Sequence, residues 1–273
     1  MKKIPFSRLH LKNLIQYLRV FTMLKIKNLT VKVLDKTILE DFNLEINRGE
    51  IHVLMGQNGA GKSTISKVLL RDLHYEITNG SIILNEKNLL NMNTTEVARE
   101  SVFLIGQNPV EIKGVSNAEM LRTTLNDQGK KEENILEFNR HLTRLCEKLL
   151  IPKEFIHRDI NYNMSGGEKK KMELLHMWML KPNFIILDEI DSGLDVDSLK
   201  LVATSIREYY EEYKPSLLII THQRALLEIV RPEFVHVLNN KKIVQSGGYE
   251  LASKIFNEGF TGASIIDKSD NVE

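Results

Sequence analysis

A glycine-rich loop between an apolar segment and a helix-forming segment constrains the fold of this chain more than any other feature. The loop reads Gly-Gln-Asn-Gly-Ala-Gly-Lys-Ser at residues 56–63 and directly follows the apolar run 51–55. The spacing Gly-x4-Gly-Lys-Ser is typical of a phosphate-binding loop, in which glycines let backbone amides turn inward around phosphate oxygens. Such a loop requires a strand before it and a helix after it. The order therefore predicts an α/β protein that binds a nucleotide.

The side chains at the end of this loop supply the groups that bound phosphates need. Lys62 brings a cation to the β and γ phosphates, and Ser63 offers a hydroxyl to Mg²⁺. The helix expected at 63–70 adds the positive end of its dipole. The complete spacing argues against a plain glycine-rich turn, but it does not distinguish kinases, GTPases and other ATPases. The residues predicted to bind nucleotide here are Gly56, Gln57, Asn58, Gly59, Ala60, Gly61, Lys62, Ser63 and Thr64.

Two acidic residues end a later apolar segment. Asp188 and Glu189 follow the run 184–187, and the carboxyl ends of sheet strands are where α/β proteins bind ligands. Asp188 is suited to hold Mg²⁺ and its waters, and Glu189 is suited to polarise the water that attacks the γ-phosphate. Alone, such a pair is more often a solvated turn. Together with the phosphate-binding loop it predicts a hydrolytic site.

A glutamine and a histidine occupy similar positions after two further predicted strands. Gln107 follows the segment 102–105, where its amide could contact Mg²⁺ or water and report occupancy of the site to the helical region beyond. His222 follows the segment 217–220, where an imidazole can donate to the γ-phosphate. Each residue alone is weak evidence, and the other seven histidines are interpreted as structural.

From Leu24 onward, short apolar segments alternate with longer helical ones, which is typical of an α/β sheet protein. The strands are expected at 51–55, 81–84, 102–105, 184–187, 217–220 and 234–238, and the helices at 63–70, 198–213 and 224–230.

A mainly helical stretch, from about Asn117 to Leu150, separates the strands into two groups. It has a polar interruption at 126–130. We therefore predict an inserted helical subdomain at 107–165, which carries Gln107 and leads to a Ser-Gly-Gly segment. The nucleotide-binding core is expected at 23–106 and 166–273.

Composition narrows the class of protein further. The 273 residues include 37 basic and 36 acidic side chains, a balance that gives no indication of nucleic-acid binding. No apolar run approaches the roughly 18 residues of a membrane span, so any membrane portion of a transporter would be another chain. The single cysteine, Cys146, is interpreted as a buried thiol in a reducing compartment.

The first 22 residues differ from the rest, with five basic and no acidic side chains before a second methionine at position 23. Four apolar residues fall on one helical face: Leu11, Leu14, Ile15 and Leu18. An amphipathic targeting segment is one interpretation of this basic extension. A misassigned start or an extension without regular structure is the favoured alternative.

Six motifs occur along the chain in a characteristic order. They are the loop at 56–64, Gln107, Ser-Gly-Gly-Glu at 165–168, Leu-Asp-Glu at 187–189, Ser-Gly-Leu-Asp at 192–195, and Thr221-His222. In this order they resemble the Walker A, Q-loop, signature, Walker B, D-loop and switch-histidine elements of ABC-type ATPases. The resemblance spans roughly residues 24–246 and implies an ABC-type P-loop core with a mixed sheet and an inserted helical subdomain.

The same resemblance implies how ATP and Mg²⁺ are held. Two subunits sandwich two Mg-ATP molecules, and Ser165, Gly166 and Gly167 of one subunit face the γ-phosphate bound by the other. Asp195 couples the two sites. Glu189, His222 and Lys62 are then the expected catalytic residues, and Ser63, Gln107 and Asp188 the expected magnesium ligands.

One departure from that family concerns the base of the nucleotide. The family usually offers an aromatic residue before the P-loop for stacking on adenine, and residues 29–39 contain none. Val31 or Val33 is expected to provide an apolar platform instead. Loss of stacking weakens base binding by about 1 kcal/mol or more, so a preference for ATP over GTP does not follow.

Segments outside the catalytic motifs resemble one family of ABC-type ATPases in particular. These segments are 108–117, the Glu-Lys-Lys-Lys at 168–171, the run 188–195 and the run 231–238. They resemble SufC, the ATPase of the Suf iron–sulfur cluster assembly system. Two positions depart from that pattern, Lys113 where proline is common and a shortened continuation after His222. These departures bear on the fit to partners more than on hydrolysis.

That resemblance implies Suf-type scaffold proteins as partners, bound at the region around 107–117, and an ATP-dependent homodimer that changes the scaffold's conformation. The chain is not expected to ligate the cluster itself, bind nucleic acid or insert into a membrane. The cytoplasm is the first expectation for its location and the plastid stroma the second. Two alternatives stay open: the ATP-binding subunit of an ABC membrane transporter, and a nucleotide-gated scaffold with negligible turnover.

Overall fold

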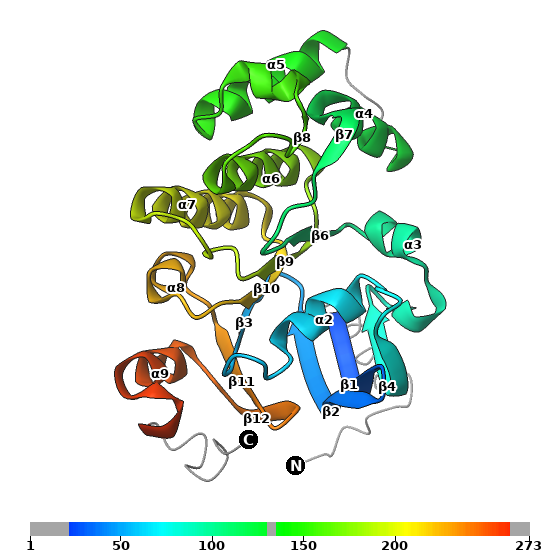
Figure 1. Ribbon diagram of the computed structural model, residues 1–273, viewed down its shortest axis with the longest axis vertical. Helices are drawn as coiled ribbons and strands as arrows, with labels where there is room; N and C mark the ends of the chain where they lie inside the picture. Colours follow the sequence, from blue (N-terminus) through cyan, green and yellow to red (C-terminus); the bar gives the residue numbers. More distant parts are fainter. Residues whose placement is uncertain (1–21, 130–134, 263–273) are drawn as a thin grey trace, which may run out of the picture.

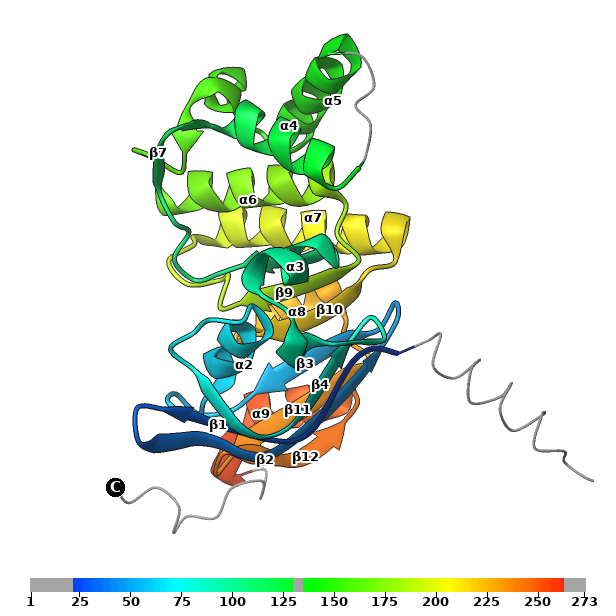
Figure 2. The ribbon, with the colours of Figure 1, turned by 90° about the vertical axis from the view of Figure 1, so that its right-hand side faces the viewer.

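The computed structural model describes residues 22–129 and 135–262. The basic extension expected at 1–22 and the charged tail expected from residue 267 therefore lie almost wholly outside the described residues. Figures 1 and 2 show sheets in one half of the molecule and a group of helices in the other, with the helices α6 and α7 between them.

A six-stranded sheet forms the centre of the molecule. Its strand order is β12-β11-β3-β10-β9-β6, and all neighbours are parallel except β11 and β12. Every residue of β3, β9 and β10 is buried, which explains their continuous apolar sequences. The strands are β3 (Ile51–Met55), β6 (Val102–Ile105), β9 (Phe184–Asp188), β10 (Ser216–Ile220), β11 (Phe234–Asn239) and β12 (Lys242–Gly247). The strands predicted in this sheet are confirmed.

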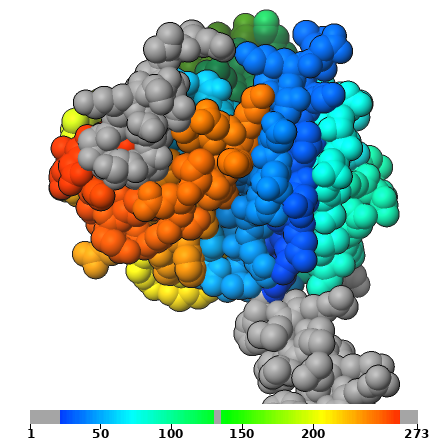
Figure 3. Space-filling model, turned by 90° about the horizontal axis from the view of Figure 1, so that it is seen from below, coloured from blue at the N-terminus to red at the C-terminus, as the bar shows by residue number. Residues whose placement is uncertain are grey.

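A second, antiparallel sheet lies beside the first. It has the order β2-β1-β4-β5 and consists of β1 (Thr22–Val33), β2 (Lys36–Asn47), β4 (Glu76–Leu84) and β5 (Lys87–Asn88). The long β1–β2 hairpin was not expected from the strand–helix alternation, because its buried and exposed residues alternate only loosely through several register shifts. Figure 3 shows β1, β2 and β12 next to one another on one face, where Glu40 N donates to Lys241 O at 3.0 Å.

The two faces of the central sheet are covered differently. Helix α2 (Lys62–Leu69) packs with the antiparallel sheet against one face, through Ile65, Val68 and Leu69. The other face is covered by α6 (Gly166–Leu180), α7 (Val196–Tyr213), α8 (Arg224–Val230) and α9 (Tyr249–Gly262). The loop before α2 therefore emerges between two sheets.

The helical half of the molecule follows β6 in the sequence (Figure 1). Its elements are β7 (Ile112–Ser116), α4 (Asn117–Asp127), α5 (Ile135–Lys148), the 3₁₀ helix η2 (Lys153–His157) and β8 (Asp159–Ile160). Helix α6 contacts α4, α5 and α7, so it joins this half to the sheet. The short elements η1 (Leu89–Asn91) and α3 (Thr94–Arg99) connect β5 to β6. The helical stretch predicted from Asn117 is confirmed within the described residues.

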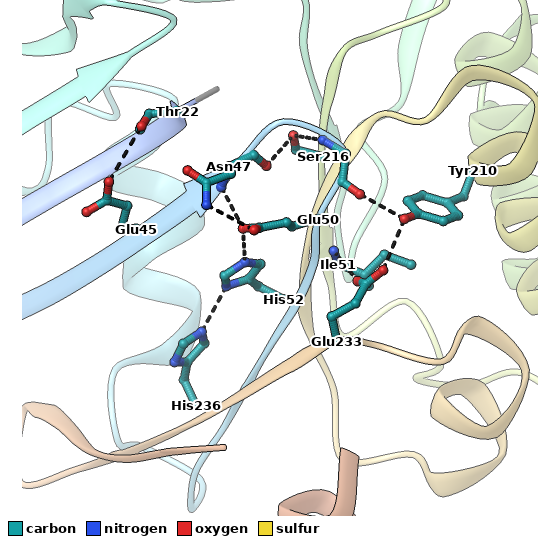
Figure 4. A network of polar contacts seen from close by, with 11 residues as sticks. Thr22, Glu45, Asn47, Glu50, Ile51, His52, Tyr210, Ser216, Glu233 and His236 are labelled. Atoms are coloured by element: carbon teal, nitrogen blue, oxygen red, sulfur yellow. Dashed lines mark hydrogen bonds and ion pairs between the residues drawn. The ribbon is translucent and has the colours of Figure 1, made fainter. Parts of the chain in front are cut away.

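A chain of polar contacts fastens β3 to its neighbours (Figure 4). His52 Nε2 lies 2.9 Å from Glu50 Oε2, and His52 Nδ1 lies 2.9 Å from His236 Nε2. His236 Nδ1 in turn lies 2.8 Å from Ser246 Oγ. Burial lowers the pKa of His52, and it lowers the pKa of His236 to about 4. The contacts therefore tie β12 and β11 to the strand that leads into the phosphate-binding loop.

Candidate functional site: a nucleotide site at the end of β3

The loop between β3 and α2 has the backbone conformation that its glycines predict. Gly59 and Gly61 have φ angles of 81° and 98°, in the left-handed region that favours glycine. Gly61 precedes α2 and offers no side-chain cap. The first amides of α2 are therefore available to an anion, as a phosphate site at a helix N-terminus requires.

Gly56 is required for a different reason than the one given by the sequence. Its φ is not positive, and a Cβ built on it would lie 2.4 Å from the carbonyl oxygen of Leu238 on β11. The neighbouring strand, rather than a phosphate, excludes a side chain here. This packing constraint comes from a residue 182 positions away in the sequence.

Lys62 lies inside the loop that it follows. Its Nζ donates to the carbonyl oxygens of Gly56 at 2.9 Å and Gln57 at 3.0 Å, and the residue is 4% exposed. Burial lowers the pKa of Lys62, while the carboxylates of Glu189 and Asp188 oppose that shift. The ammonium group is thus already placed where the loop would receive phosphates.

Asp188 receives two hydroxyl groups from α2. Ser63 Oγ donates to Asp188 Oδ1 at 2.9 Å, and Ser66 Oγ donates to Asp188 Oδ2 at 2.6 Å. Two oxygens at right angles around one Mg²⁺, each about 2.1 Å from it, lie about 3 Å apart. The oxygens of Ser63 and Asp188 therefore fit a magnesium site. Ser66 was not among the predicted site residues, although its place about one turn after Ser63 on the same helix was a signal for it.

Glu189 follows β9 in a left-handed conformation, with φ of 49°. This conformation costs a residue with a side chain about 1 kcal/mol or more. The backbone N–H of Glu189 donates to the carbonyl oxygen of Ile220 at 2.8 Å, which holds the turn against β10. The carboxylate is near enough to Lys62 to affect its pKa. The fold thus maintains a strained backbone at the glutamate that is expected to be catalytic.

His222 follows β10 on the same edge of the sheet. Burial lowers its pKa first, the nearby Lys62 ammonium lowers it further, and Asp191 opposes them. The Thr221 hydroxyl donates to Asp191 Oδ1 at 2.7 Å, so the turns after β9 and β10 are joined. The structure therefore brings together Lys62, Ser63, Asp188, Glu189 and His222.

The other predicted site residues lie after β6 and at the starts of α6 and α7. Gln107 is exposed directly after β6. Ser165 caps α6, with its hydroxyl accepting from Glu168 N at 3.3 Å while the Glu168 carboxylate accepts from Ser165 N at 2.7 Å. Asp195 caps α7 by accepting from Ser198 N at 2.7 Å. A Cβ at Gly167 would lie 3.4 Å from Ser198 Oγ, so the signature segment and the start of α7 are neighbours.

The expected apolar platform for the base is half wrong. Val31 is fully buried in the core between the two sheets and cannot face a ligand. Val33 is partly exposed at the end of β1 and stays a prediction. The loose alternation of this strand concealed which of the two valines points outward.

Within residues 22–129 and 135–262, no helix is long and apolar enough to cross a membrane. In the same residues, no three His, Cys, Asp or Glu side chains are grouped as a metal site would need.

The fold and the site define a P-loop nucleotide-binding protein of the ABC class, and comparisons with known proteins agree. The profile of the ABC transporter family matches residues 39–192. The "Probable ATP-dependent transporter ycf16" of Cyanophora paradoxa is 42% identical over 87% of this chain and 93% of its own length. The "Iron-sulfur cluster assembly protein SufC" of Plasmodium falciparum is also 42% identical, over 83% of this chain and 66% of its own length.

A solved structure shows the same fold. The dimeric post-hydrolysis state of an ATP-binding cassette bound to ADP and Pi has a TM-score of 0.70 and 20% identity, covering 83% of this chain and 98% of that one. The chain belongs to the ABC ATPase family and is a homologue of SufC. It is an ATP hydrolase by that membership.

Proposed function

We propose that this chain is the Mg²⁺-dependent ATPase subunit of an iron–sulfur cluster assembly complex, in which ATP-driven dimerisation changes the conformation of a Suf-type scaffold. The observation that carries the proposal is the 42% identity to an iron–sulfur cluster assembly protein over 83% of the chain. The residues at the end of β3 supply the chemistry. In this proposal the chain binds no iron–sulfur cluster itself and acts by changing the conformation of its partners.

In this proposal the P-loop and the residues around it bind and orient the triphosphate. Lys62 exchanges the carbonyl oxygens of Gly56 and Gln57 for β and γ phosphate oxygens. Ser63, Asp188 and Gln107 are the proposed ligands of Mg²⁺, which neutralises phosphate charge when bound. The rest of the loop, residues 56–64, surrounds the phosphates with backbone amides.

Glu189 and His222 act on the attacking water and the γ-phosphate. Glu189 orients the water and accepts its proton. The lowered pKa of His222 keeps its imidazole neutral at pH 7, so that it donates one N–H to the γ-phosphate without adding a charge.

The signature segment completes the site of a second copy of the chain. Ser165 caps α6, and Gly166 and Gly167 begin it, where the helix dipole favours the γ-phosphate held by the partner. Asp195, at the start of α7, couples the two sites. The dimer described for the structural relative supports this arrangement.

The helical half provides the surface for the scaffold. Val110 and Ile112 follow Gln107 and are 72% and 44% exposed, which suits them to an apolar contact with another protein. Lys113 also lies here, with its ammonium 4.5 Å from the centre of the Tyr162 ring. We retain 107–165 as the inserted helical subdomain, with the region around 107–117 as its partner-binding part. We also retain 23–106 and 166–273 as the nucleotide-binding core, and the cytoplasm, or else the plastid stroma, as the location.

An affinity pull-down of the full chain, with and without Mg-ATP, tests this function. We expect Suf-type scaffold proteins to be captured, and a second copy of the chain to join when Mg-ATP is present. Capture of an integral membrane permease without scaffold proteins would show that the chain is a transporter subunit.

The transporter subunit is the second candidate because the Cyanophora relative carries a transporter name. A nucleotide-gated scaffold with negligible turnover is the third. Steady-state phosphate release by the complex separates it from the first two, since only a hydrolase gives release that depends on Glu189.

A further inference from the structure

Two charged side chains of α6 hold the backbone of Gly106, the residue before Gln107. The buried ammonium group of Lys170 donates to the carbonyl oxygen of Gly106 and lies 3.0 Å from Glu173 Oε2. The Glu173 carboxylate lies close enough to the backbone N–H of Gly106 for that group to lower its pKa. One side chain of α6 thus binds the Gly106 carbonyl, and a second, about one helical turn away, lies beside its N–H. We call Lys170, Glu173 and the Gly106 backbone the Gly106 clamp.

Stability alone does not account for this ion pair. The side chains of Lys170 and Glu173 are only 3% and 12% exposed. Burial raises the pKa of Glu173, against the opposing effects of Lys170 and the Gly106 N–H. Apolar side chains of similar volume often replace a buried ion pair without loss of stability. What such side chains could not do is bind the carbonyl group of Gly106.

The clamp connects two segments of the proposed ATP machinery. Gly106 lies between the end of β6 and Gln107, whereas Ser165 caps the same helix that carries the clamp. Lys170 is five residues beyond Ser165, about 8 Å along the helix axis. A second polar contact of α6, from His176 Nε2 to Asn117 Oδ1 at 2.8 Å, attaches it to the start of α4. A displacement at Gln107 would therefore be passed to α6 through short, buried contacts.

We propose that Lys170 and Glu173 are positioning residues that make the Gln107 segment and the signature segment Ser165–Gly167 move as one body. ATP and Mg²⁺ at a subunit's own P-loop would then set the orientation of the signature segment that this subunit offers to its partner. The proposal rests on the proposed function, because it assumes that Gln107 senses the nucleotide.

Hydrogen exchange measured by mass spectrometry tests the coupling without requiring hydrolysis. The full chain is studied with a non-hydrolysable ATP analogue and Mg²⁺, at a protein concentration at which it is monomeric. In the unaltered chain we expect the nucleotide to slow exchange several-fold both in peptides covering 56–64 and in peptides covering 165–172.

The decisive variant is the double change Lys170→Met and Glu173→Leu, which removes the clamp while keeping the volume. We expect it to fold, to retain the slowing at 56–64, and to lose the slowing at 165–172. Its turnover should fall about tenfold or more with little change in KM, because the misplaced segment contacts the partner's ATP only during the reaction. Lys170→Met, which removes the donor to the Gly106 carbonyl, serves as the second variant and is judged in the same way if the double variant does not fold.

Two controls separate the clamp from an ordinary ion pair. Glu211→Gln breaks an exposed ion pair of α7 with Arg207 and Lys214, so it should leave every readout unchanged. The exchange Lys170→Glu with Glu173→Lys preserves the ion pair but reverses the donor and acceptor offered to Gly106. It should restore stability without restoring the slowing at 165–172.

The outcomes distinguish the two proposals. Slowing at 165–172 that persists in the folded double variant, or turnover restored by the charge exchange, overturns the clamp alone. Failure of the nucleotide to slow exchange at 56–64 in the unaltered chain overturns the proposed function, and the clamp proposal with it.

Discussion

The P-loop and the start of α6 are both glycine-rich and both assigned to ATP, but their surroundings differ. A Cβ at Gly56 would lie 2.4 Å from Leu238 O, and one at Gly61 would lie 3.1 Å from the Ile38 side chain. A Cβ at Gly166 would meet nothing within 4 Å. The fold of the chain itself therefore requires two P-loop glycines, whereas it gives no packing reason for Gly166.

The polar groups of the two regions show the same difference. Ser63 contacts Asp188, which lies on another strand of the sheet, and Lys62 contacts the carbonyl groups of Gly56 and Gln57 in the loop. The hydroxyl of Ser165 contacts only the first turn of its own helix through Glu168. The P-loop is thus held by the rest of its own subunit, whereas the start of α6 is left open. A composite site between two subunits needs this combination.

The largest effect on turnover should come from Glu189, next to the P-loop. Glu189→Gln removes the group that accepts the water's proton, so turnover should fall by about 10²–10⁴-fold while ATP stays bound. Phosphate release and binding of a fluorescent ATP analogue measure the two quantities. Glu211→Gln, which changes an exposed ion pair with Arg207 and Lys214, is the matched control. Unchanged phosphate release in Glu189→Gln would remove this residue from catalysis.

Mixing two inactive variants tests whether the signature segment acts on the ATP site of a partner subunit. Lys62→Ala removes the cation of the P-loop, and Gly166→Val blocks the signature segment without a clash inside the subunit. Each variant alone should lose about 10²-fold or more in turnover, because a preorganised electrostatic group is missing from both sites of the dimer.

A mixture of the two should regain turnover, since one composite site then has an intact P-loop and an intact signature segment. The mixture is assayed by phosphate release over a range of ratios. Turnover that stays at the level of the separate variants would mean that the signature segment acts within its own chain.

Acid should lower the stability of the folded chain, because both α6 and the central sheet contain a buried neutral histidine. Burial lowers the pKa of His176 on α6, and that of His236 on β11, to about 4. The unfolded chain protonates these groups near pH 6.5, so the stability that they contribute above that pH is lost as the pH falls to about 4. For His176 the loss amounts to about 3 kcal/mol.

Urea unfolding at several pH values measures this dependence. His176→Gln cannot titrate, so its free energy of unfolding should fall less steeply between pH 6.5 and 4. An unchanged slope in that variant would show that His176 is not buried in its neutral form.

The smallest effects should distinguish the glycines themselves. Gly56→Ala should cost about 1–3 kcal/mol of unfolding free energy, because the carbonyl group of Leu238 must move. Gly166→Ala should change stability by no more than about 0.5 kcal/mol. Thermal unfolding of the two variants compares them directly, and equal destabilisation would contradict the packing difference between the two regions.

Much of the site could be predicted because its residues lie at the ends of short apolar segments. Asp188, Gln107 and His222 each follow a strand of the central sheet, so their order along the chain already indicated a common edge. The platform valines could not be distinguished in the same way, because the burial of Val31 depends on the register of the β1–β2 hairpin and on packing against α2. Ser66 was missed because its hydroxyl can bond to Asp188 only when α2 lies against β9.

The amino-acid sequence by itself determined the phosphate-binding loop, the order of the motifs and the α/β class, since these depend on local spacing and on the identity of neighbouring residues. The tertiary structure alone decided that Gly56 is fixed by Leu238, that Ser66 shares Asp188 with Ser63, and that two side chains of α6 hold Gly106. Each of these depends on a contact between segments far apart in the chain. Such contacts arise from how the sheets and helices pack, and no local pattern encodes the packing.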